Sequence, residues 1–530
     1  MIKGHRGKPT GMLDFTGISR TYLERVFAAE IRAEEHLEAG QRKLLGALLH
    51  AGARTRFGAN HGFAAFRSYE EFAEKMPVTD FAMLRPYVME MVNGGRDILW
   101  PGSTRSFAQS SGTSDGKSKY IPLTQRSLQK GHYAGAAFSV ASYLHYHRDS
   151  HIFGGKNFIL GGSFANELQL PQGVKVGDLS ATLIDSINPI ANLFRIPSKQ
   201  IALMERWEEK LPALVEASSV ADVRSLSGVP SWFLTVLRGV LKRTGASSIH
   251  DVWPNLEVFF HGGIAFGPYR RQYEAITDRR RMRYWENYNA SEGFFGVQAL
   301  PGKPDMRLLM NTDVFYEFIP AEDPSAAPVP SWEVKKGKIY ALVITSGNGL
   351  WRYPLGDTVL VTGTAPLTVT IAGRTRSFIN AFGEEVMVYN TDAALDAACR
   401  ATGAEVLDYT VAPVYADGGE RGRHEWLIEF SRMPADMDAF ARVLDSALQN
   451  ENSDYQAKRS GDIFLAPLTV VTGASGVFDR WLASTGKLGG QRKVPRLCND
   501  RRIMDPLLRF NNEIATNSAD TDKTDHQTSL

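Results

Sequence analysis

The chain has 530 residues, of which 43% are apolar and 22% charged, and its formal net charge is +2. This length exceeds what one ordinary hydrophobic core contains, so we expect two or three domains. The near balance of charge gives no reason to expect a nucleic acid partner, because such proteins usually carry a clear basic excess. The two cysteines are too few for a disulfide framework or a C-x-x-C…C-x-x-C metal site.

Neither the N-terminus nor the hydropathy of the chain points to export or to membrane insertion. The opening residues, MIKGHR, contain no apolar segment of the kind that a signal peptide requires. No segment approaches the roughly 18 consecutive apolar residues that a membrane-spanning helix needs. We therefore expect a soluble, cytoplasmic protein with reduced thiols and no membrane partner.

The first regular pattern along the chain is helical. Between residues 20 and 53, apolar residues recur at the spacing of one helix face, with charged residues on the opposite side. Further on, the apolar segments 158–160 and 256–260 each stop at a pair of glycines, and a helical stretch at 200–217 lies between them. Helices that alternate with short apolar strands are typical of an α/β fold with a mostly parallel sheet.

After Asp313 the pattern changes to strands with little helix. The strand-like segments lie at 314–319, 338–344, 358–361 and 367–371. They predict antiparallel strands or a small barrel.

Beyond Arg374 the pattern predicts a compact α+β domain. Its helix, two strands, helix and strand are expected at 392–401, 406–411, 425–430, 436–448 and 463–471. The last residues, from Asn517 onward, are polar and have no apolar anchor, which predicts disorder. We therefore expect an N-terminal domain at 1–374, a C-terminal domain at 375–512 and a disordered tail at 513–530.

The segment Ser110–Lys119, SSGTSDGKSK, is similar to two common enzyme motifs but fits neither. A phosphate-binding P-loop has four residues between its glycines, whereas three separate Gly112 from Gly116. The nucleophile elbow of hydrolases, G-x-S-x-G, would make Ser114 a nucleophile. Both motifs need a helix directly after the loop, and Pro122 instead keeps the following residues extended. A P-loop is therefore excluded, and a serine hydrolase is the weakest alternative that stays open.

The same segment is better explained as the loop of a hairpin. Its flanks at 105–108 and 120–123 are both strand-like, which a simple flexible linker would not usually show. Backbone N–H groups, hydroxyls and lysines of such a loop are suited to wrap the phosphates of ATP. The sequence therefore predicts a phosphate-binding hairpin.

Several segments resemble motifs of the GH3 acyl acid–amido synthetases, a branch of the adenylate-forming superfamily. In order they are SSGTSDGKSK at 110–119, YNASEG at 288–293, LWRYPLGD at 350–357 and QRKVPR at 491–496. The N-terminal stretch LLHAGARTRFGANHGF also resembles the family. Trp351 stands where the third motif has another aromatic residue, and Arg492 replaces a tyrosine of the last motif. The resemblance extends over residues 45–500, approximately.

The resemblance implies a large adenylate-forming N-terminal domain, with parallel sheets and a small β-barrel, and a mobile α+β lid. It also implies ATP and Mg²⁺ as cofactors. In the implied reaction a carboxylate attacks the α-phosphate of ATP, giving acyl-AMP and pyrophosphate, and the amine of an amino acid then displaces AMP. The partners would be a small carboxylic acid and an amino acid or other amine, neither of which the sequence identifies.

The resemblance assigns the pyrophosphate of ATP to the hairpin and Mg²⁺ to the second motif. The hairpin residues are Ser110, Ser111, Gly112, Thr113, Ser114, Gly116 and Lys119. The glycines would allow close backbone approach, and Lys119 would be catalytic by neutralising charge. Glu292 would hold Mg²⁺ against phosphate oxygens, because a hard cation prefers a carboxylate.

The nucleoside is assigned to residues on later strands. Tyr288, with Ser291 of the same motif, would border the adenine, as would the glycine pair Gly262 and Gly263. Asp357 would accept hydrogen bonds from the ribose hydroxyls. Arg374 would be the hinge and would contact the ribose or a phosphate.

The lid would bring a lysine to the adenylate. Lys493 is our assignment, and Lys487 is a rival because acyl-CoA ligases of the same superfamily carry their lysine after a glycine. A general base for the amine is unassigned, although His132 is a candidate. Two further alternatives stay open: a ligase with a thiol acceptor, such as CoA, and a non-catalytic protein that binds nucleotides or small acids.

Overall fold

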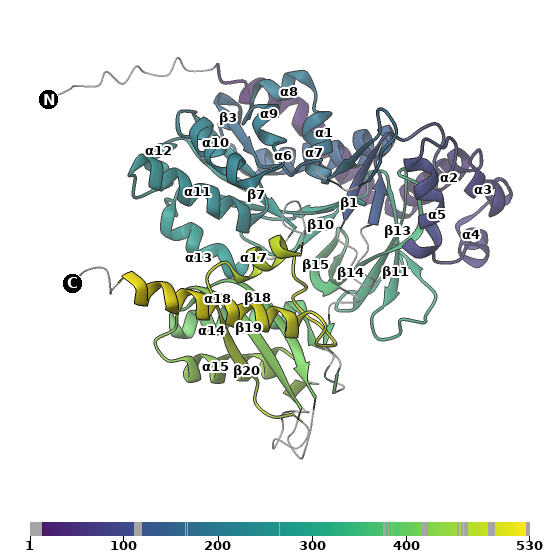
Figure 1. The fold of residues 1–530 in the computed structure, drawn as a ribbon. Coiled ribbons are helices and arrows are strands. Elements are labelled where there is room, and N and C mark those ends of the chain that lie inside the picture. Colours follow the sequence, from purple (N-terminus) through teal and green to yellow (C-terminus); the bar gives the residue numbers. More distant parts are fainter. Residues whose placement is uncertain are drawn as a thin grey trace.

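The structure is a computed structural model. It describes residues 13–110, 119–164, 166, 168–263, 266–374, 378–379, 381–382, 384, 386–415, 422–452, 455–456, 459, 465–485 and 493–525. A large N-terminal domain and a smaller C-terminal domain lie one above the other in Figure 1. Among the described residues no helix is both long and apolar enough to cross a membrane.

The N-terminal part of the described chain is helical. It consists of α1 (Thr16–Glu35), α2 (Leu37–Gly52), α3 (Arg56–Asn60), η1 (Phe63–Ala65), α4 (Tyr69–Lys75) and α5 (Phe81–Val92). The stretch predicted as helical at 20–53 is two helices, because His36 has a non-helical backbone with φ −119° and ψ 36°. Helices α2 to α5 gather at one end of the molecule (Figure 1).

The two strands predicted on either side of residues 111–118 are confirmed, and the segment between them lies outside the described residues. β1 (Ser106–Ser110) and β2 (Lys119–Pro122) pair antiparallel, with Ser110 opposite Lys119. β4 (Lys175–Gly177) adds to β1 in parallel. The hairpin therefore presents Ser110 and Lys119 together at the end where its loop begins.

The largest sheet contains both kinds of predicted strand. In spatial order it runs β12-β11-β13-β14-β15-β10-β9-β8-β7-β6-β3-β5. Its strands are β3 (Lys156–Ile159), β5 (Arg195–Ile196), β6 (Val223–Gly228), β7 (Val258–Gly262), β8 (Arg283–Ala290), β9 (Gly293–Gln298), β10 (Met306–Leu308), β11 (Val314–Pro320), β12 (Val329–Pro330), β13 (Ile339–Ser346), β14 (Leu350–Thr364) and β15 (Leu367–Arg374). In this spatial order, every pair of neighbouring strands from β12 to β8 is antiparallel, and every pair from β8 to β5 is parallel. The α/β fold class is confirmed, but the two strand types form one continuous sheet.

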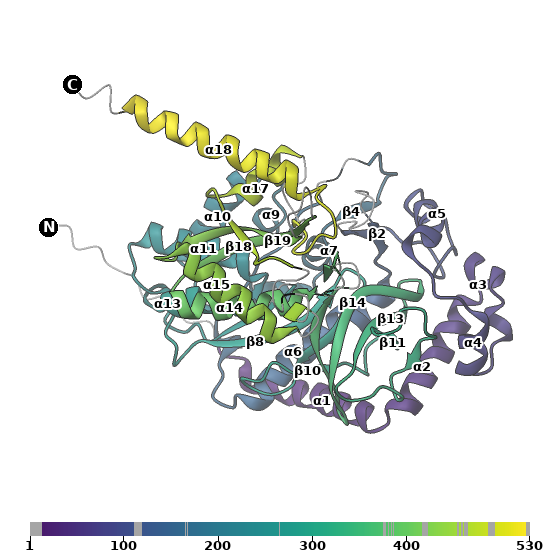
Figure 2. The same cartoon turned by 90° about the horizontal axis from the view of Figure 1, so that it is seen from below.

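Helices cover both faces of the parallel half of this sheet. They are η2 (Ser127–His132, a π-helical turn), α6 (Tyr133–Tyr146), η3 (Ile152–Gly154), α7 (Leu179–Asp185), α8 (Pro189–Leu193), α9 (Lys199–Ala202), α10 (Trp207–Ser219), α11 (Pro230–Thr244), α12 (Ile249–Val252) and α13 (Gly267–Ile276). Val258 and Phe260 pack with α1 and α6, whereas Phe259 packs with α11 and α13. Figure 2 shows α11 and α13 on the side nearer the C-terminal domain. The helix predicted at 200–217 is interrupted between α9 and α10.

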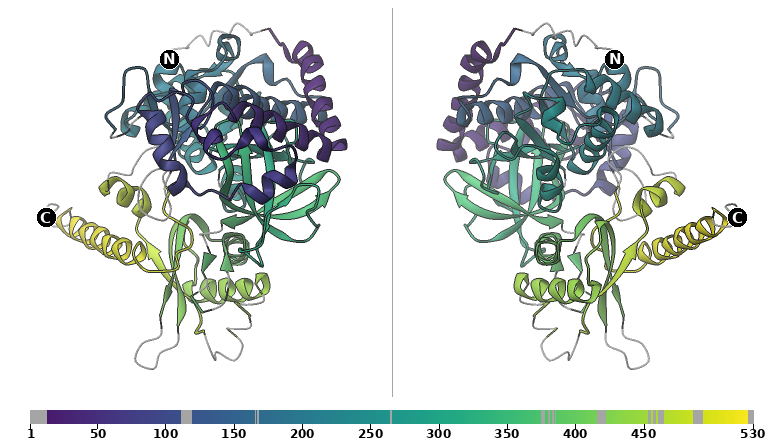
Figure 3. Two further views of the ribbon diagram at one scale, coloured as in Figure 1. Left: turned by 90° about the vertical axis from the view of Figure 1, so that its right-hand side faces the viewer. Right: turned by 90° about the vertical axis from the view of Figure 1, so that its left-hand side faces the viewer.

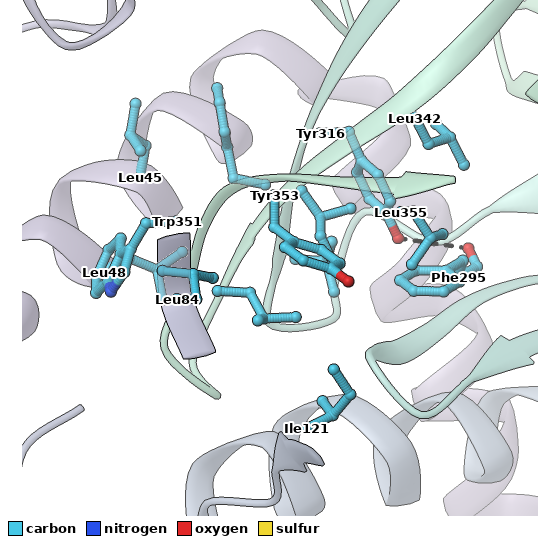
Figure 4. Close-up of a cluster of buried hydrophobic side chains, with 14 of the residues drawn as sticks. Leu45, Leu48, Leu84, Ile121, Phe295, Tyr316, Leu342, Trp351, Tyr353 and Leu355 are labelled. Atoms are coloured by element: carbon cyan, nitrogen blue, oxygen red, sulfur yellow. Dashed lines mark hydrogen bonds between the residues drawn. The ribbon is translucent and has the colours of Figure 1, made fainter. Parts of the chain in front are cut away.

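The antiparallel half of the sheet packs on the N-terminal helices. Trp351, Tyr353 and Leu355 point from β14 into a buried cluster that includes Leu48 of α2 and Leu84 of α5 (Figure 4). Residues two apart on a strand face the same side, so this cluster uses one face of β14. The third sequence motif is therefore anchored on rigid structure.

The C-terminal domain has the predicted order of helix, two strands, helix and strand. It contains β16 (Phe378–Ile379), β17 (Val386–Met387), α14 (Val388–Thr402), β18 (Glu405–Val414), β19 (Arg423–Arg432), α15 (Met437–Glu451), β20 (Thr469–Gly473), α17 (Val477–Ser484) and α18 (Met504–Asp525). Its sheet has the order β18-β19-β20, and Figure 3 shows its helices and strands as a separate lower part of the molecule.

The end of the chain differs from the sequence prediction. Disorder is predicted from residue 513, whereas α18 continues as a helix to Asp525. The helix starts from an anchor, because Met504 and Leu507 are buried. The Asn511 side chain also accepts from the N–H of Ala474 at 2.6 Å. The polar composition of the last residues does not reveal this anchor, which precedes them.

Candidate active site

Lys119 is the first residue of β2, and its side chain lies beside two aromatic rings. Its Nζ donates to the hydroxyl of Tyr353 at 3.2 Å and lies 5.8 Å and 5.7 Å from the ring centroids of Phe81 and Tyr353. Aromatic faces attract a cation, so the ammonium group is held between these two rings. The predicted residues Ser111, Gly112, Thr113, Ser114 and Gly116 lie outside the described residues, and only the backbone of Ser110 is described.

The second and third motifs are joined by a hydrogen bond. The hydroxyl of Tyr288 on β8 donates to Oδ2 of Asp357 on β14 at 2.8 Å, and both side chains are buried. The sheet order places β9, β10 and β15 between these strands. Neighbouring strands lie about 4.8 Å apart, so a flat sheet would separate β8 from β14 by about 19 Å. The sheet must therefore curl here, and the curl brings the two motifs together.

Glu292 and Ser291 occupy the turn between β8 and β9. Both side chains are buried. The Asn348 amide donates to the backbone carbonyl of Glu292 at 3.0 Å, and the Ser346 hydroxyl donates to Asn348 at 2.5 Å. These bonds fix the turn against the segment that precedes β14. A carboxylate on so fixed a turn suits a hard cation that takes its other ligands from phosphates and water.

The described residues contain no cluster that could hold a metal ion without such help. No group of three or more His, Cys, Asp or Glu side chains among them is arranged for metal binding. Mg²⁺ commonly uses one or two carboxylates together with substrate phosphates. A single carboxylate such as that of Glu292 is therefore compatible with a cation that binds together with the nucleotide.

Gly262 and Gly263 lie where the parallel strand β7 ends. A Cβ atom on Gly262 would come within 2.4 Å of the carbonyl oxygen of Asn287, and Gly263 has a φ of +80°. Close approach and left-handed backbone both favour glycine. The carboxyl ends of parallel strands are where ligands bind in α/β proteins, so the pair borders the expected crevice.

Two titratable residues at this edge were not predicted from the sequence as site residues. His261 and Glu286 occupy the same register on β7 and β8. Burial raises the pKa of Glu286 to about 7, which Arg270 opposes, and burial and Arg270 together lower the pKa of His261 to about 3. Glu286 precedes Tyr288 by two residues and shares its face of the strand. That spacing is the signal that could have identified Glu286.

Two residues of the third motif have structural contacts. The Arg352 guanidinium donates to both carboxylate oxygens of Glu317, at 2.9 Å and 2.7 Å, and also to the carbonyl of Ala73 at 2.8 Å. The Trp351 indole donates to the carbonyl of Leu99 at 3.1 Å. Both side chains are buried. They hold the first part of β14 in place, and this also positions Asp357 further along the same strand.

The remaining predicted residues are on the connection to the lid and on the lid itself. The backbone of Arg374 pairs with Asp357 across β14 and β15, which brings the predicted hinge beside the predicted ribose ligand. Lys493 lies on the C-terminal domain, in a segment that runs beside β18. Lys487 lies outside the described residues.

His132 is buried at the end of the π-helical turn. Neither ring nitrogen has a hydrogen-bond partner among the described residues, and burial lowers its pKa to about 4. The imidazole is therefore uncharged at neutral pH. It lies on a turn that packs against β9, the strand that follows Glu292.

Comparison with known protein families identifies the fold. The model of the GH3 family N-terminal domain matches residues 31–190 and 149–282, that of the central domain residues 307–374, and that of the C-terminal domain residues 389–502. The chain belongs to the GH3 family. The resemblance predicted from the motifs is therefore confirmed.

Similar GH3 proteins cover almost the whole chain. Indole-3-acetic acid-amido synthetase GH3.3 of Arabidopsis thaliana is 24% identical over 88% of this chain and 90% of its own. Indole-3-acetic acid-amido synthetase GH3.8 of Oryza sativa subsp. indica is 23% identical over 87% of this chain and 88% of its own. A solved acyl acid amido synthetase, AtGH3.15 in complex with 2,4-DB, has a TM-score of 0.76 at 18% identity and covers 96% of this chain and 98% of its own.

A CoA ligase has a similar fold. A 2-hydroxyisobutyryl-CoA ligase in the postadenylation state has a TM-score of 0.56 at 14% identity, over 89% of this chain and 91% of its own. This likeness concerns the fold alone.

Proposed function

We propose that the chain is an ATP-dependent acyl acid–amido synthetase. It would convert a small carboxylic acid and ATP into acyl-AMP and pyrophosphate, and then transfer the acyl group to the amine of an amino acid. The observation that supports this most is the Tyr288–Asp357 bond, which joins two nucleotide motifs close to the Gly262 edge in a GH3 fold.

In the first step the site must stabilise charge on the leaving pyrophosphate. The Lys119 ammonium, held against Tyr353, would neutralise part of this charge without reorganisation. Bound Mg²⁺ would neutralise further charge on the phosphate oxygens, with Glu292 as its protein ligand. Asp357, oriented by Tyr288, would accept hydrogen bonds from both ribose hydroxyls.

In the second step the amine attacks the acyl carbon, and the C–O bond to AMP breaks. We propose that the C-terminal domain, from residue 375 to 512, acts as a lid that rotates about Arg374 between the two steps. Lys493 would provide the cation that the lid brings to the phosphate of the adenylate as the adenylate forms in the first step, which is the step that pyrophosphate exchange measures. Both cysteines are free, which supports a cytoplasmic location.

A ligase with a thiol acceptor is the second candidate, because the fold of the CoA ligase is similar. Acid-dependent exchange of pyrophosphate into ATP tests the step that both candidates share. A panel of aryl, indole and aliphatic acids should contain at least one acid that promotes exchange. Absence of exchange with every acid, and no AMP release when amino acids are added, would support a non-catalytic binding protein instead.

A further inference from the structure

The segment that carries Lys493 is attached to the edge of the C-terminal sheet. The Thr410 hydroxyl donates to the carbonyl of Pro495 at 2.6 Å, and the N–H of Val411 donates to the carbonyl of Arg496 at 2.8 Å. These bonds add a short extended segment beside β18. The position of Lys493, two residues before Pro495, therefore depends on how firmly this segment is held.

The Arg496 side chain fastens the segment to β18. Its Nη1 lies 3.1 Å from Oδ1 of Asp408, and its Cζ lies 4.3 Å from the centroid of the Tyr409 ring. Tyr409 is itself fixed, because its hydroxyl donates to Oδ1 of Asp392 at 2.6 Å. A planar guanidinium suits a carboxylate and an aromatic face together, which an ammonium group does less well.

The N-terminal domain contacts the same part of the C-terminal domain through α13. Three side chains of this helix donate hydrogen bonds to backbone carbonyls of the lid. The bonds run from Tyr269 to Leu407 (2.9 Å), from Gln272 to Val406 (3.1 Å) and from Arg271 to Cys399 (3.2 Å). The register of β18 against β19 shifts between Val406 and Asp408, and such a bulge leaves a backbone group outside the ladder. The bulge is thus the surface on which α13 rests.

Tyr269 connects this contact to Arg496. Burial raises the pKa of the Tyr269 phenol, and the nearby Arg496 guanidinium opposes the increase. The same phenol donates to Leu407 of the bulge. α13 also begins shortly after Gly263, at the edge where the nucleotide is expected. A set of contacts therefore leads from α13 to the segment that carries Lys493.

We propose that Arg496 is a positioning residue that places Lys493, acting through Asp408, Tyr409 and Tyr269 where the lid rests on α13. This inference rests on the proposed function, which assigns Lys493 as the cation of the lid. It assigns no direct contact between Arg496 and substrate. Docking of the lid and placement of the lysine are coupled by one side chain.

The kinetic test measures Arg496→Met in two backgrounds, the natural chain and Lys493→Met. In the natural background the kcat of acid-dependent pyrophosphate exchange should fall about 10- to 100-fold with little change in KM for ATP, because misplacement by about 1 Å costs about that much. In the Lys493→Met background the same change should cost less than about 2-fold, because the two residues act as a unit. Arg496→Lys, which keeps the charge, should restore part of the rate.

Arg432→Met is the matched control, because Arg432 forms an ion pair with Glu405 near the start of β18. It should leave the exchange rate unchanged. Amide hydrogen exchange at Val411 provides a measure that needs no substrate, and Arg496→Met should accelerate it. If the natural chain exchanges no pyrophosphate with any acid, the proposed function fails, while the Val411 amide still tests the anchoring.

Three results would overturn the inference. Arg496→Met could cost as much in the Lys493→Met background as in the natural one. The Val411 amide could exchange at the same rate in the natural chain and in Arg496→Met. Lys493→Met alone could retain the natural rate, which would remove the lysine assignment together with the inference.

Discussion

The hydroxyl of Tyr288 donates a hydrogen bond of 2.8 Å to the carboxylate of Asp357, although 69 residues separate them in the chain. One residue is expected to border the adenine and the other to bind the ribose. Their bond would make these two expected nucleotide contacts parts of one preorganised unit, because it orients the Asp357 carboxylate without a nucleotide.

Tyr288→Phe should weaken nucleotide binding while retaining the aromatic ring. The loss of one hydrogen bond, worth about 0.5–1.5 kcal/mol, should raise the KM for ATP by about 2- to 13-fold. Pyrophosphate exchange at varied ATP concentration measures this. Tyr316→Phe is the control, because the Tyr316 hydroxyl contacts the Phe295 carbonyl at 3.5 Å in the neighbouring core (Figure 4). Equal KM values for Tyr288→Phe and the natural chain would contradict the assignment.

Lys119→Ala should slow adenylation without unfolding the protein. Removal of one preorganised cation from a phosphate site typically reduces the rate about 100-fold. Lys175→Ala on β4, a strand of the same sheet, is the control, because Lys175 pairs with Asp185. Thermal unfolding of both variants should match the natural chain. Unchanged pyrophosphate exchange in Lys119→Ala would remove the residue from the phosphate site.

His132→Leu should stabilise the fold. Its imidazole is buried with no hydrogen-bond partner among the described residues, and such a group costs about 1–3 kcal/mol. His250→Leu is the matched control and should destabilise, because the His250 ring contacts the carbonyl of Leu256 and accepts from the N–H of Asp278, both at 3.0 Å. Urea unfolding gives both differences. A His132→Leu chain less stable than the natural one would show that the imidazole has a partner in solution.

The lowered pKa of His132 also predicts how the stability of the fold depends on pH. Its folded pKa of about 4 lies below the ordinary value of 6.5, so the unfolded chain binds more protons between these values. Stability should therefore fall as the pH decreases from 6.5 towards 4. His132→Leu should show a smaller decrease in the free energy of unfolding over this range. Parallel pH profiles for the two proteins would contradict the shift.

Glu286 predicts a pH dependence of stability with the opposite sign, and Glu286→Gln should remove it. Burial raises the folded pKa of Glu286 from 4.5 to about 7, so the folded chain binds more protons in this range. The natural chain therefore loses stability as the pH rises through 7. The variant should gain up to about 3 kcal/mol relative to it between pH 5 and pH 8. Glu322→Gln, at an exposed ion pair with Lys338, should show no such gain.

Much of the fold could be predicted because the signals are local, whereas the site residues stay predictions. The strands on either side of the hairpin loop follow from apolar flanks and from Pro122, and both are present. The order of elements in the C-terminal domain follows from segment periodicity alone. The motifs themselves identify the family, because each combines unusual residues at a fixed spacing.

What the sequence did not reveal depends on contacts between distant segments. The Tyr288–Asp357 bond requires the sheet to curl across the intervening strands, and no local pattern encodes that. The continuity of the parallel and antiparallel strands likewise depends on pairing between β8 and β9. The helix α18 extends into a polar stretch because of an anchor near Met504. Composition over a short window could not predict any of these.

The most direct test of the proposed function is a product analysis in one mixture. The protein is incubated with ATP, Mg²⁺, a panel of aryl, indole and aliphatic acids, the amino acids and CoA, and the products are separated by mass spectrometry. We predict an acyl–amino acid conjugate formed together with AMP and pyrophosphate. A thioester of CoA as the product, or no AMP with any acid, would contradict it.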